Sequence, residues 1–277
     1  MDKVILQARD GASAEIFTHG AHVCSWIPAN GREQLFLSKT SEFREGAAIR
    51  GGVPVVFPQF SNLGPLPKHG FARTAIWRLV RSEQLEHGAA QAVFELQETL
   101  SSLQIWPQVF RAELMVTVAE QSLQLDFAVV NNGDTAFSFS SALHTYFRID
   151  DIQQTRLHGL GGLEYRDTVT GQEHCQQQEE ILRINGEIDR IYADVVADIG
   201  IEQPHQFVHI RQSGFNDAVV WNPGAEKGAQ LSDLEADGYQ RMVCVETASI
   251  IRPITLHPGE SWNGSQVMQL HCVNPRM

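Results

Sequence analysis

One histidine in the chain has neighbours that suit a general acid or a general base. If the segment around it is extended, side chains alternate between two faces, so His144 shares a face with Tyr146 and Arg148, opposite Leu143 and Phe147. This polar and partly aromatic face suits the lining of a cleft that binds a sugar. The alternative is a half-exposed histidine with a purely structural role.

Glu246 is a second candidate for acid–base chemistry, because it closes the apolar run 242–245. In a partly dry pocket its pKa would rise toward neutrality, since burial disfavours the charged form of a carboxyl group. A group that titrates near neutral pH is an effective general acid or base. The alternative is an ordinary strand end in water.

The segment 50–73 is the third candidate, because it contains Arg50, Lys68, His69 and Arg73 but no aspartate or glutamate. Its four prolines and four glycines keep it out of long regular elements. Guanidinium groups and a Gly-Gly backbone suit the binding of an anion such as phosphate. The alternative is a solvated loop whose basic residues pair with surface carboxylates.

Asp189 precedes Arg190 in a polar loop that enters a short apolar and aromatic stretch. Taken alone, an acidic residue beside an arginine indicates no more than an ordinary ion pair.

The composition excludes several classes of protein. The chain has 21 basic and 33 acidic residues and a formal charge of -12, which disfavours binding to nucleic acid or to anionic membranes. The N-terminus does not resemble a signal peptide, and no apolar run approaches the ~18 residues of a membrane span. The four cysteines form no CxxC pair and the eleven histidines form no HExxH motif, which is typical of reduced thiols without a metal site. A cytoplasmic location is therefore expected.

Period-two alternation is the commonest pattern and predicts strands. The runs 122–129 and 137–149 flank the turn cluster 131–134 and predict a β-hairpin. Further strands are expected at 4–8, 14–26, 77–81, 92–97, 113–119, 208–211, 218–221, 242–246 and 266–273. Short helical pieces are expected only near 232–236 or 202–207. Many short strands without a βαβ rhythm predict an all-β sandwich or barrel, and no linker divides the single domain expected over residues 1–277.

Six motifs in order resemble the aldose 1-epimerase (galactose mutarotase-like) superfamily, and most closely its glucose-6-phosphate 1-epimerase branch. They spread across most of the chain, and each is weak singly. The motifs are Arg50-Gly51-Gly52-Val53-Pro54 with Phe57-Pro58, Lys68-His69-Gly70-Phe71-Ala72-Arg73 with Trp77, Leu143-His144-Thr145-Tyr146-Phe147, Asp189-Arg190-Ile191-Tyr192, Val219-Val220-Trp221-Asn222-Pro223, and Cys244-Val245-Glu246.

The resemblance implies a large antiparallel β-sandwich of the galactose mutarotase-like supersandwich type, with an open cleft and no metal or organic cofactor. It also implies that His144 is the general acid and Glu246 the general base. We expect the two side chains to converge on opposite sides of one sugar ring.

The resemblance further implies that Arg50, Arg73 and Asp189 hold the substrate and that His69 lies near the sugar ring. Lys68 departs from the pattern, because similar proteins often have glutamine before the His-Gly pair. A lysine could hold a phosphate as a point charge in place of an amide contact.

The function implied is that of an isomerase, a glucose-6-phosphate 1-epimerase, acting as a monomer on a hexose 6-phosphate. A base removes the O1 proton while an acid protonates the ring oxygen, and the two steps reverse after rotation about the C1–C2 bond. Two alternatives remain open: a mutarotase for unphosphorylated aldoses, and a sugar-binding module without catalysis on the same fold.

Overall fold

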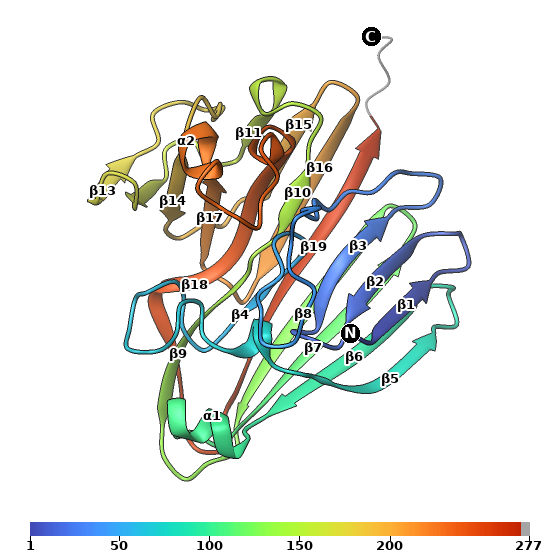
Figure 1. The fold of residues 1–277 in the computed structure, drawn as a ribbon, viewed down its shortest axis with the longest axis vertical. Coiled ribbons are helices and arrows are strands. Elements are labelled where there is room, and N and C mark those ends of the chain that lie inside the picture. Colours follow the sequence, from blue (N-terminus) through green and yellow to red (C-terminus); the bar gives the residue numbers. More distant parts are fainter. Residues whose placement is uncertain (273–277) are drawn as a thin grey trace.

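The computed structural model describes residues 1–272, and most of its regular secondary structure consists of antiparallel strands in three sheets (Figure 1). The predicted all-β antiparallel sandwich is therefore confirmed. Within the described residues, no helix has the length and apolar character needed to cross a membrane.

The smallest sheet has three strands, which are β1 (Lys3–Gln7), β2 (Ser13–Phe17) and β3 (His22–Ile27). The second sheet has eight strands, in the order β13 (Gln172–Gln176), β12 (Glu164–Asp167), β14 (Ile188–Tyr192), β17 (Asp217–Asn222), β18 (Met242–Leu256), β9 (Phe137–Leu143) and β4 (Val55–Val56), with β10 (Tyr146–Arg148) paired to β18. The third sheet also has eight, in the order β11 (Arg156–His158), β15 (Ile199–Gln203), β16 (Gln206–Ser213), β19 (Ser261–Cys272), β8 (Ser122–Asn131), β7 (Phe110–Ala119), β6 (Ala90–Gln97) and β5 (Arg78–Gln84).

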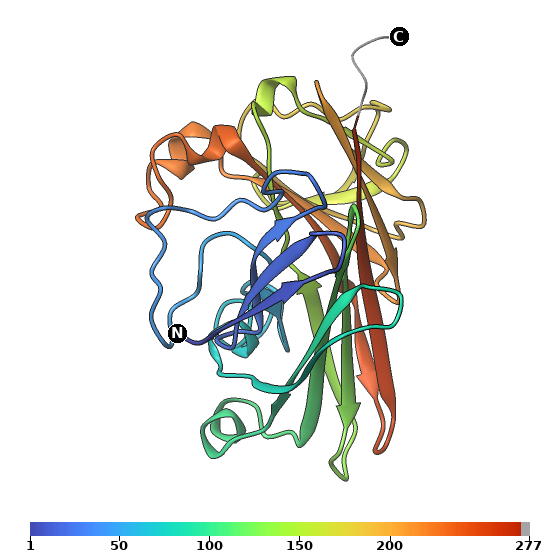
Figure 2. The same ribbon diagram turned by 90° about the vertical axis from the view of Figure 1, so that its right-hand side faces the viewer.

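Helices are few and short. They are α1 (Leu100–Ile105), α2 (Gly224–Gly228) and three 3₁₀ turns, η1 (Ala72–Thr74), η2 (Ile152–Gln154) and η3 (Gly238–Arg241). The β1–β3 sheet contacts β6 and β7, and both ribbon views show its blue strands over the edge of the third sheet (Figures 1 and 2).

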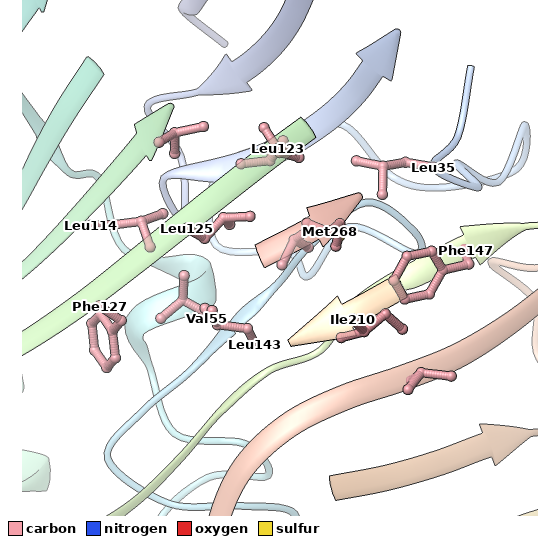
Figure 3. Close-up of a cluster of buried hydrophobic side chains, with 14 of the residues drawn as sticks. Leu35, Val55, Leu114, Leu123, Leu125, Phe127, Leu143, Phe147, Ile210 and Met268 are labelled. Carbon is pink, nitrogen blue, oxygen red and sulfur yellow. The ribbon is translucent and has the colours of Figure 1, made fainter. Parts of the chain in front are cut away.

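The main hydrophobic core lies between the two large sheets (Figure 3). Side chains that alternate inward along β7 and β8, such as Leu114, Leu125 and Phe127, pack in one cluster with Leu143 and Phe147 from the second sheet. This alternation is the pattern that predicted the strands, and it leaves the other face of the second sheet free to carry polar groups.

The predicted hairpin of 122–129 and 137–149 is wrong. β8 pairs with β7 and β19, whereas β9 pairs with β18 and β4, so the two strands lie in different sheets. The buried amide of Asn131 donates to the carbonyl oxygens of Thr135 and Leu256 and accepts from the backbone N–H of Gly133. These bonds shape 132–136 into an arch that carries the chain from one sheet to the other.

The helical pieces expected near 202–207 and 232–236 are also wrong. Residues 202–207 form the turn and ends of the antiparallel pair β15–β16, and 232–236 form turns. The predicted strand 14–26 is two strands, β2 and β3. Helix α1 was not predicted, although Thr99 and Ser102 form a capping box at its N-terminus.

Three cysteines, Cys24, Cys175 and Cys244, are free thiols, as expected. The side chain of Cys272 and the predicted strand residue Val273 lie outside the described part of the chain.

Candidate functional site

The two candidate acid–base residues meet on the outer face of the second sheet. His144 follows the last residue of β9, and its backbone N–H donates to the carbonyl oxygen of Pro54 at 3.0 Å. Glu246 lies within β18, where its register partner is Val219. The Nε2 atom of His144 lies 3.3 Å from Oε1 of Glu246, and their side chains are only 9% and 1% exposed.

This contact overturns one expectation, because 3.3 Å leaves no room for a sugar ring between the two groups. They do not lie on opposite sides of a ring. They can address it from one side, since O1 and the ring oxygen of a hexose are bonded to the same carbon.

The environment favours the neutral form of both groups. Burial is the main cause that lowers the pKa of His144 well below its ordinary value, and the neighbouring His69, Arg73 and Arg50 lower it further. Burial also raises the pKa of Glu246 well above its ordinary value, and the charge of Asp189 adds to this effect. Burial therefore favours a protonated carboxyl group beside a neutral imidazole in the unliganded pair.

His69 is held beside this pair by an unusual backbone. Its φ of 64° lies in the left-handed region, and its Nδ1 atom accepts a hydrogen bond from the backbone N–H of Ser61 at 3.3 Å. Its ring lies 5.5 Å from that of His144. Burial is the main cause that lowers the pKa of His69 to about 3, so the imidazole is neutral. Strain of this kind is common where a side chain must be aimed at a ligand.

The loop before His69 is shaped by one buried glutamine. Gln59 is 4% exposed, and its amide group donates to the carbonyl oxygens of Ser61 and Leu66 and accepts from the backbone N–H of Leu66. The loop therefore wraps around a single side chain and returns to the cleft at Lys68.

Four cations surround the cleft, and they differ in their partners. Arg50 forms an ion pair with Asp233 at 3.1 Å, and Lys227 pairs with Glu187 at 2.7 Å. Within residues 1–272, the side chains of Lys68 and Arg73 have no carboxylate within 4.0 Å. Arg73 instead donates from Nη2 to the carbonyl oxygen of Lys68 at 3.0 Å.

The alternative to an anion site was a loop whose basic residues pair with surface carboxylates. Two of the basic residues in segment 50–73, Lys68 and Arg73, have no such pairing in the part of the chain that the structure describes. Partial burial, together with Arg73, Lys227 and Arg50, lowers the pKa of Lys68. Such crowding of like charges is unfavourable unless an anion binds among them.

Asp189 contributes a carboxylate to the same cleft from β14, where its register partner is Trp221. Burial is the main cause that raises its pKa, and a hydrogen bond from Thr168 opposes this effect. A carboxylate in this position suits sugar hydroxyl groups, which are hydrogen-bond donors.

Six of the seven residues predicted for the site line one open cleft, whose empty volume, partly continuous with solvent, is about 550 Å³. These six are Arg50, Lys68, His69, His144, Asp189 and Glu246. The seventh, Arg73, is not among the residues that line the cleft, but it donates to the carbonyl oxygen of Lys68, which does line it. The convergence of these polar groups in one cleft suits a small polar ligand.

Two further residues line the cleft. Lys227 was not predicted, and Trp221 was named only within one of the six motifs. The chain has only four lysines, and this scarcity is a signal that applies to Lys227 as well as to Lys68. Asp233 was also missed, because no pattern in the sequence connects it with Arg50.

No group of three or more histidine, cysteine, aspartate or glutamate side chains in the described range 1–272 is arranged to hold a metal ion.

Comparisons with known proteins point to one family. Residues 2–269 match the family described as aldose 1-epimerase. A protein of Cenchrus ciliaris, provisionally named glucose-6-phosphate 1-epimerase, is 36% identical over 274 residues, which are 95% of this chain and 83% of the relative. A protein of Escherichia coli K12 with the same provisional name is 34% identical over 239 residues, covering 85% of this chain and 79% of the relative.

Among solved structures, a protein of Salmonella typhimurium provisionally described as a mutarotase superimposes with a TM-score of 0.90 at 27% identity. The match covers 98% of this chain and 91% of that one.

Proposed function

Since the chain belongs to the aldose 1-epimerase family, we propose that it interconverts the α and β anomers of a hexose 6-phosphate, with glucose 6-phosphate as the expected substrate. One observation carries the proposal: His144 and Glu246 touch in a cleft that is lined by Lys68, whose carbonyl oxygen accepts from Arg73, and neither of these two cations has a carboxylate partner within the described residues.

The phosphate binds to Lys68 and Arg73, with Arg50 as a third cationic group. Guanidinium groups grip phosphate oxygens through several hydrogen bonds, whereas a lysine acts as a point charge. Asp189 and the neutral His69 hold the hydroxyl groups of the sugar.

Phosphate binding also prepares the acid and the base. The positive charges of Arg73 and Arg50 disfavour an imidazolium at His144, and a bound dianion cancels much of their field. The proton then moves across the 3.3 Å contact from Glu246 to His144. This step produces the carboxylate base and the imidazolium acid where the substrate lies.

In the chemical step, Glu246 removes the proton from O1 and His144 donates a proton to the ring oxygen. The bond between C1 and the ring oxygen breaks, its electron pair stays on that oxygen, and a carbonyl forms at C1. After rotation about the C1–C2 bond, the two residues reverse their roles and close the ring on the other face. Each group typically contributes ~10² to 10⁴-fold to such a reaction.

The same proposal includes the protein's setting. We infer a single domain over residues 1–277 that acts as a monomer in the cytoplasm, without a metal, an organic cofactor, nucleic acid or a membrane as partner. The formal charge of -12 supports the last two points.

The test is anomer exchange measured by two-dimensional NMR exchange spectroscopy on glucose 6-phosphate and on glucose. We expect the wild-type protein to accelerate exchange of the phosphorylated sugar, and Arg73→Ala to weaken that reaction without weakening exchange of glucose. Equal efficiency on both sugars would refute phosphate recognition. Tight binding without exchange would indicate a sugar-binding module instead.

A further inference from the structure

Tyr146 connects the anion-binding side of the cleft with the acid–base pair. Its ring stacks on the imidazole of His144, with centroids 4.8 Å apart and an angle of 9° between the planes. Its hydroxyl oxygen accepts a hydrogen bond from Nη1 of Arg50 at 3.0 Å. One rigid side chain therefore touches both functional groups.

The position of Tyr146 is fixed on every side. The residue is 3% exposed and lies in β10, which pairs with β18 so that Tyr146 is opposite Cys244. Trp221 packs edge-on against both rings of the stack, at 6.0 Å from each and at 79° to each. The ring cannot rotate away without displacing Trp221 or Cys244.

Arg50 depends on this hydroxyl for its orientation. Its guanidinium has two polar partners within residues 1–272, Tyr146 through Nη1 and Asp233 through Nη2. Asp233 belongs to the turns between α2 and η3, whereas Tyr146 belongs to the sheet. The hydroxyl therefore ties Arg50 to β10, which begins two residues after His144, and the ring of Trp221 lies 5.8 Å from the same guanidinium.

We propose that Tyr146 is a positioning residue, which sets Arg50 through its hydroxyl group and His144 through its ring, so that a phosphate held by Arg50 places C1 of the sugar against the imidazole. This inference rests on the proposed function. It assigns Tyr146 no contact with the reacting atoms.

Such a link matters because acid–base catalysis needs the reacting atoms at close and aligned distances, and a misplacement of about 1 Å is enough to cost ~10²-fold in rate. The phosphate end of a hexose 6-phosphate is far from C1 along the sugar. Any tilt of the gripping guanidinium is therefore magnified at the anomeric centre.

The test separates the hydroxyl from the ring. Tyr146→Phe keeps the stack and removes the contact with Arg50, so KM for glucose 6-phosphate should rise about tenfold with kcat little changed and exchange of glucose unaffected. Tyr146→Leu also removes the ring, so kcat should fall as well. The matched control is Tyr192→Phe, which removes a buried hydroxyl bonded to Gln177, and it should change neither constant.

A double-mutant cycle then asks whether the hydroxyl acts through Arg50. In an Arg50→Met background, Tyr146→Phe should have no further effect on KM, or on the Kd for glucose 6-phosphate measured by calorimetry. An undiminished effect in that background would overturn the proposal, as would equal losses with glucose and glucose 6-phosphate.

The two proposals fail in different ways. A wild-type protein that binds glucose 6-phosphate without exchanging its anomers would refute the proposed function. The same cycle, measured on Kd, would still decide the role of the Tyr146 hydroxyl.

Discussion

The carboxyl group of Glu246 lies 3.3 Å from the imidazole of His144, although Glu246 belongs to β18 and His144 lies directly after β9. Both are nearly inaccessible to solvent, and burial favours the neutral form of each. The cations near His144 lower its pKa further, and the charge of Asp189 raises the pKa of Glu246 further. A proton shared by such a pair is sensitive to any anion that binds nearby, and this sensitivity is the basis of the first prediction.

Replacing either member of the pair should remove catalysis. We expect His144→Asn and Glu246→Gln each to reduce protein-catalysed anomer exchange of glucose 6-phosphate at least ~10²-fold, as measured by NMR exchange spectroscopy. The control is His174→Asn, because the side chain of His174 is 86% exposed. Unchanged exchange in both variants of the pair would exclude these residues from the reaction.

Glu246→Gln should also stabilise the fold at neutral pH. Because burial raises the pKa of Glu246 above the 4.5 of an exposed glutamate, the folded state retains a proton that the unfolded state releases. The free energy of unfolding therefore falls as pH rises from 4.5 toward the raised pKa, and the glutamine variant lacks this loss. Urea titrations at pH 4.5 and pH 7 would show it, and equal pH dependence of variant and wild type would contradict it.

Lys68 should give specificity for the phosphorylated sugar. We expect Lys68→Gln to raise KM for glucose 6-phosphate by about tenfold and to leave exchange of glucose unchanged, because only the phosphate needs the cation. Lys39→Gln is the matched control, since Lys39 is an exposed lysine away from the cleft. If Lys68→Gln impaired both sugars equally, Lys68 would have a structural role.

His22 should make the fold sensitive to acid. It is 1% exposed, and burial, with smaller effects of His19 and Arg73, lowers its pKa to about 3. Below pH 6.5 the unfolded state binds a proton at this residue and the folded state does not. The free energy of unfolding therefore decreases as the pH is lowered.

The shift at His22 alone removes about 2 kcal/mol between pH 6.5 and pH 5. His22→Gln should therefore lose less stability than the wild type over this range in urea titrations, whatever its absolute stability. His87→Gln, at an exposed position, should follow the wild-type curve. If His22→Gln also followed the wild-type curve, His22 would be protonated in the folded protein over this range, which contradicts the prediction.

Gln59 should control the order of the loop that carries Lys68. Gln59→Leu has a similar volume but removes three hydrogen bonds to Ser61 and Leu66, and the unfolding free energy should fall by about 1–3 kcal/mol. Hydrogen exchange in residues 61–68 should become faster, and KM for glucose 6-phosphate should rise. The control is Gln178→Leu, at an exposed glutamine, which should change none of these quantities. If Gln59→Leu also changed none of them, the loop would be held by other contacts.

The alternating pattern predicted strands well, because inward side chains such as Leu123 and Phe127 are buried whichever strand lies next to them. It could not predict the pairing of β8 and β9. A turn at 131–134 is compatible both with a hairpin and with an arch between sheets, and the choice depends on Leu256, whose carbonyl oxygen accepts from Asn131 across the fold.

The residues of the site likewise divide into those that the sequence predicts and those that it does not. Residues within recognisable motifs, such as Arg50 and Glu246, could be named from the sequence. Asp233 could not be named, because its role is to form an ion pair with Arg50. Which loops far apart in the chain come close together is decided only when the sheets fold.

Strand β18 is the central member of the second sheet, since it pairs with β17, β9 and β10 and also carries Glu246. During translation, His144 and the basic segment leave the ribosome well before this strand does. A nascent chain that ends before Met242 has neither the carboxyl group nor the scaffold that joins the two halves of the sheet. Activity must therefore begin abruptly, late in synthesis, and a truncated product of premature termination cannot act as a weak enzyme.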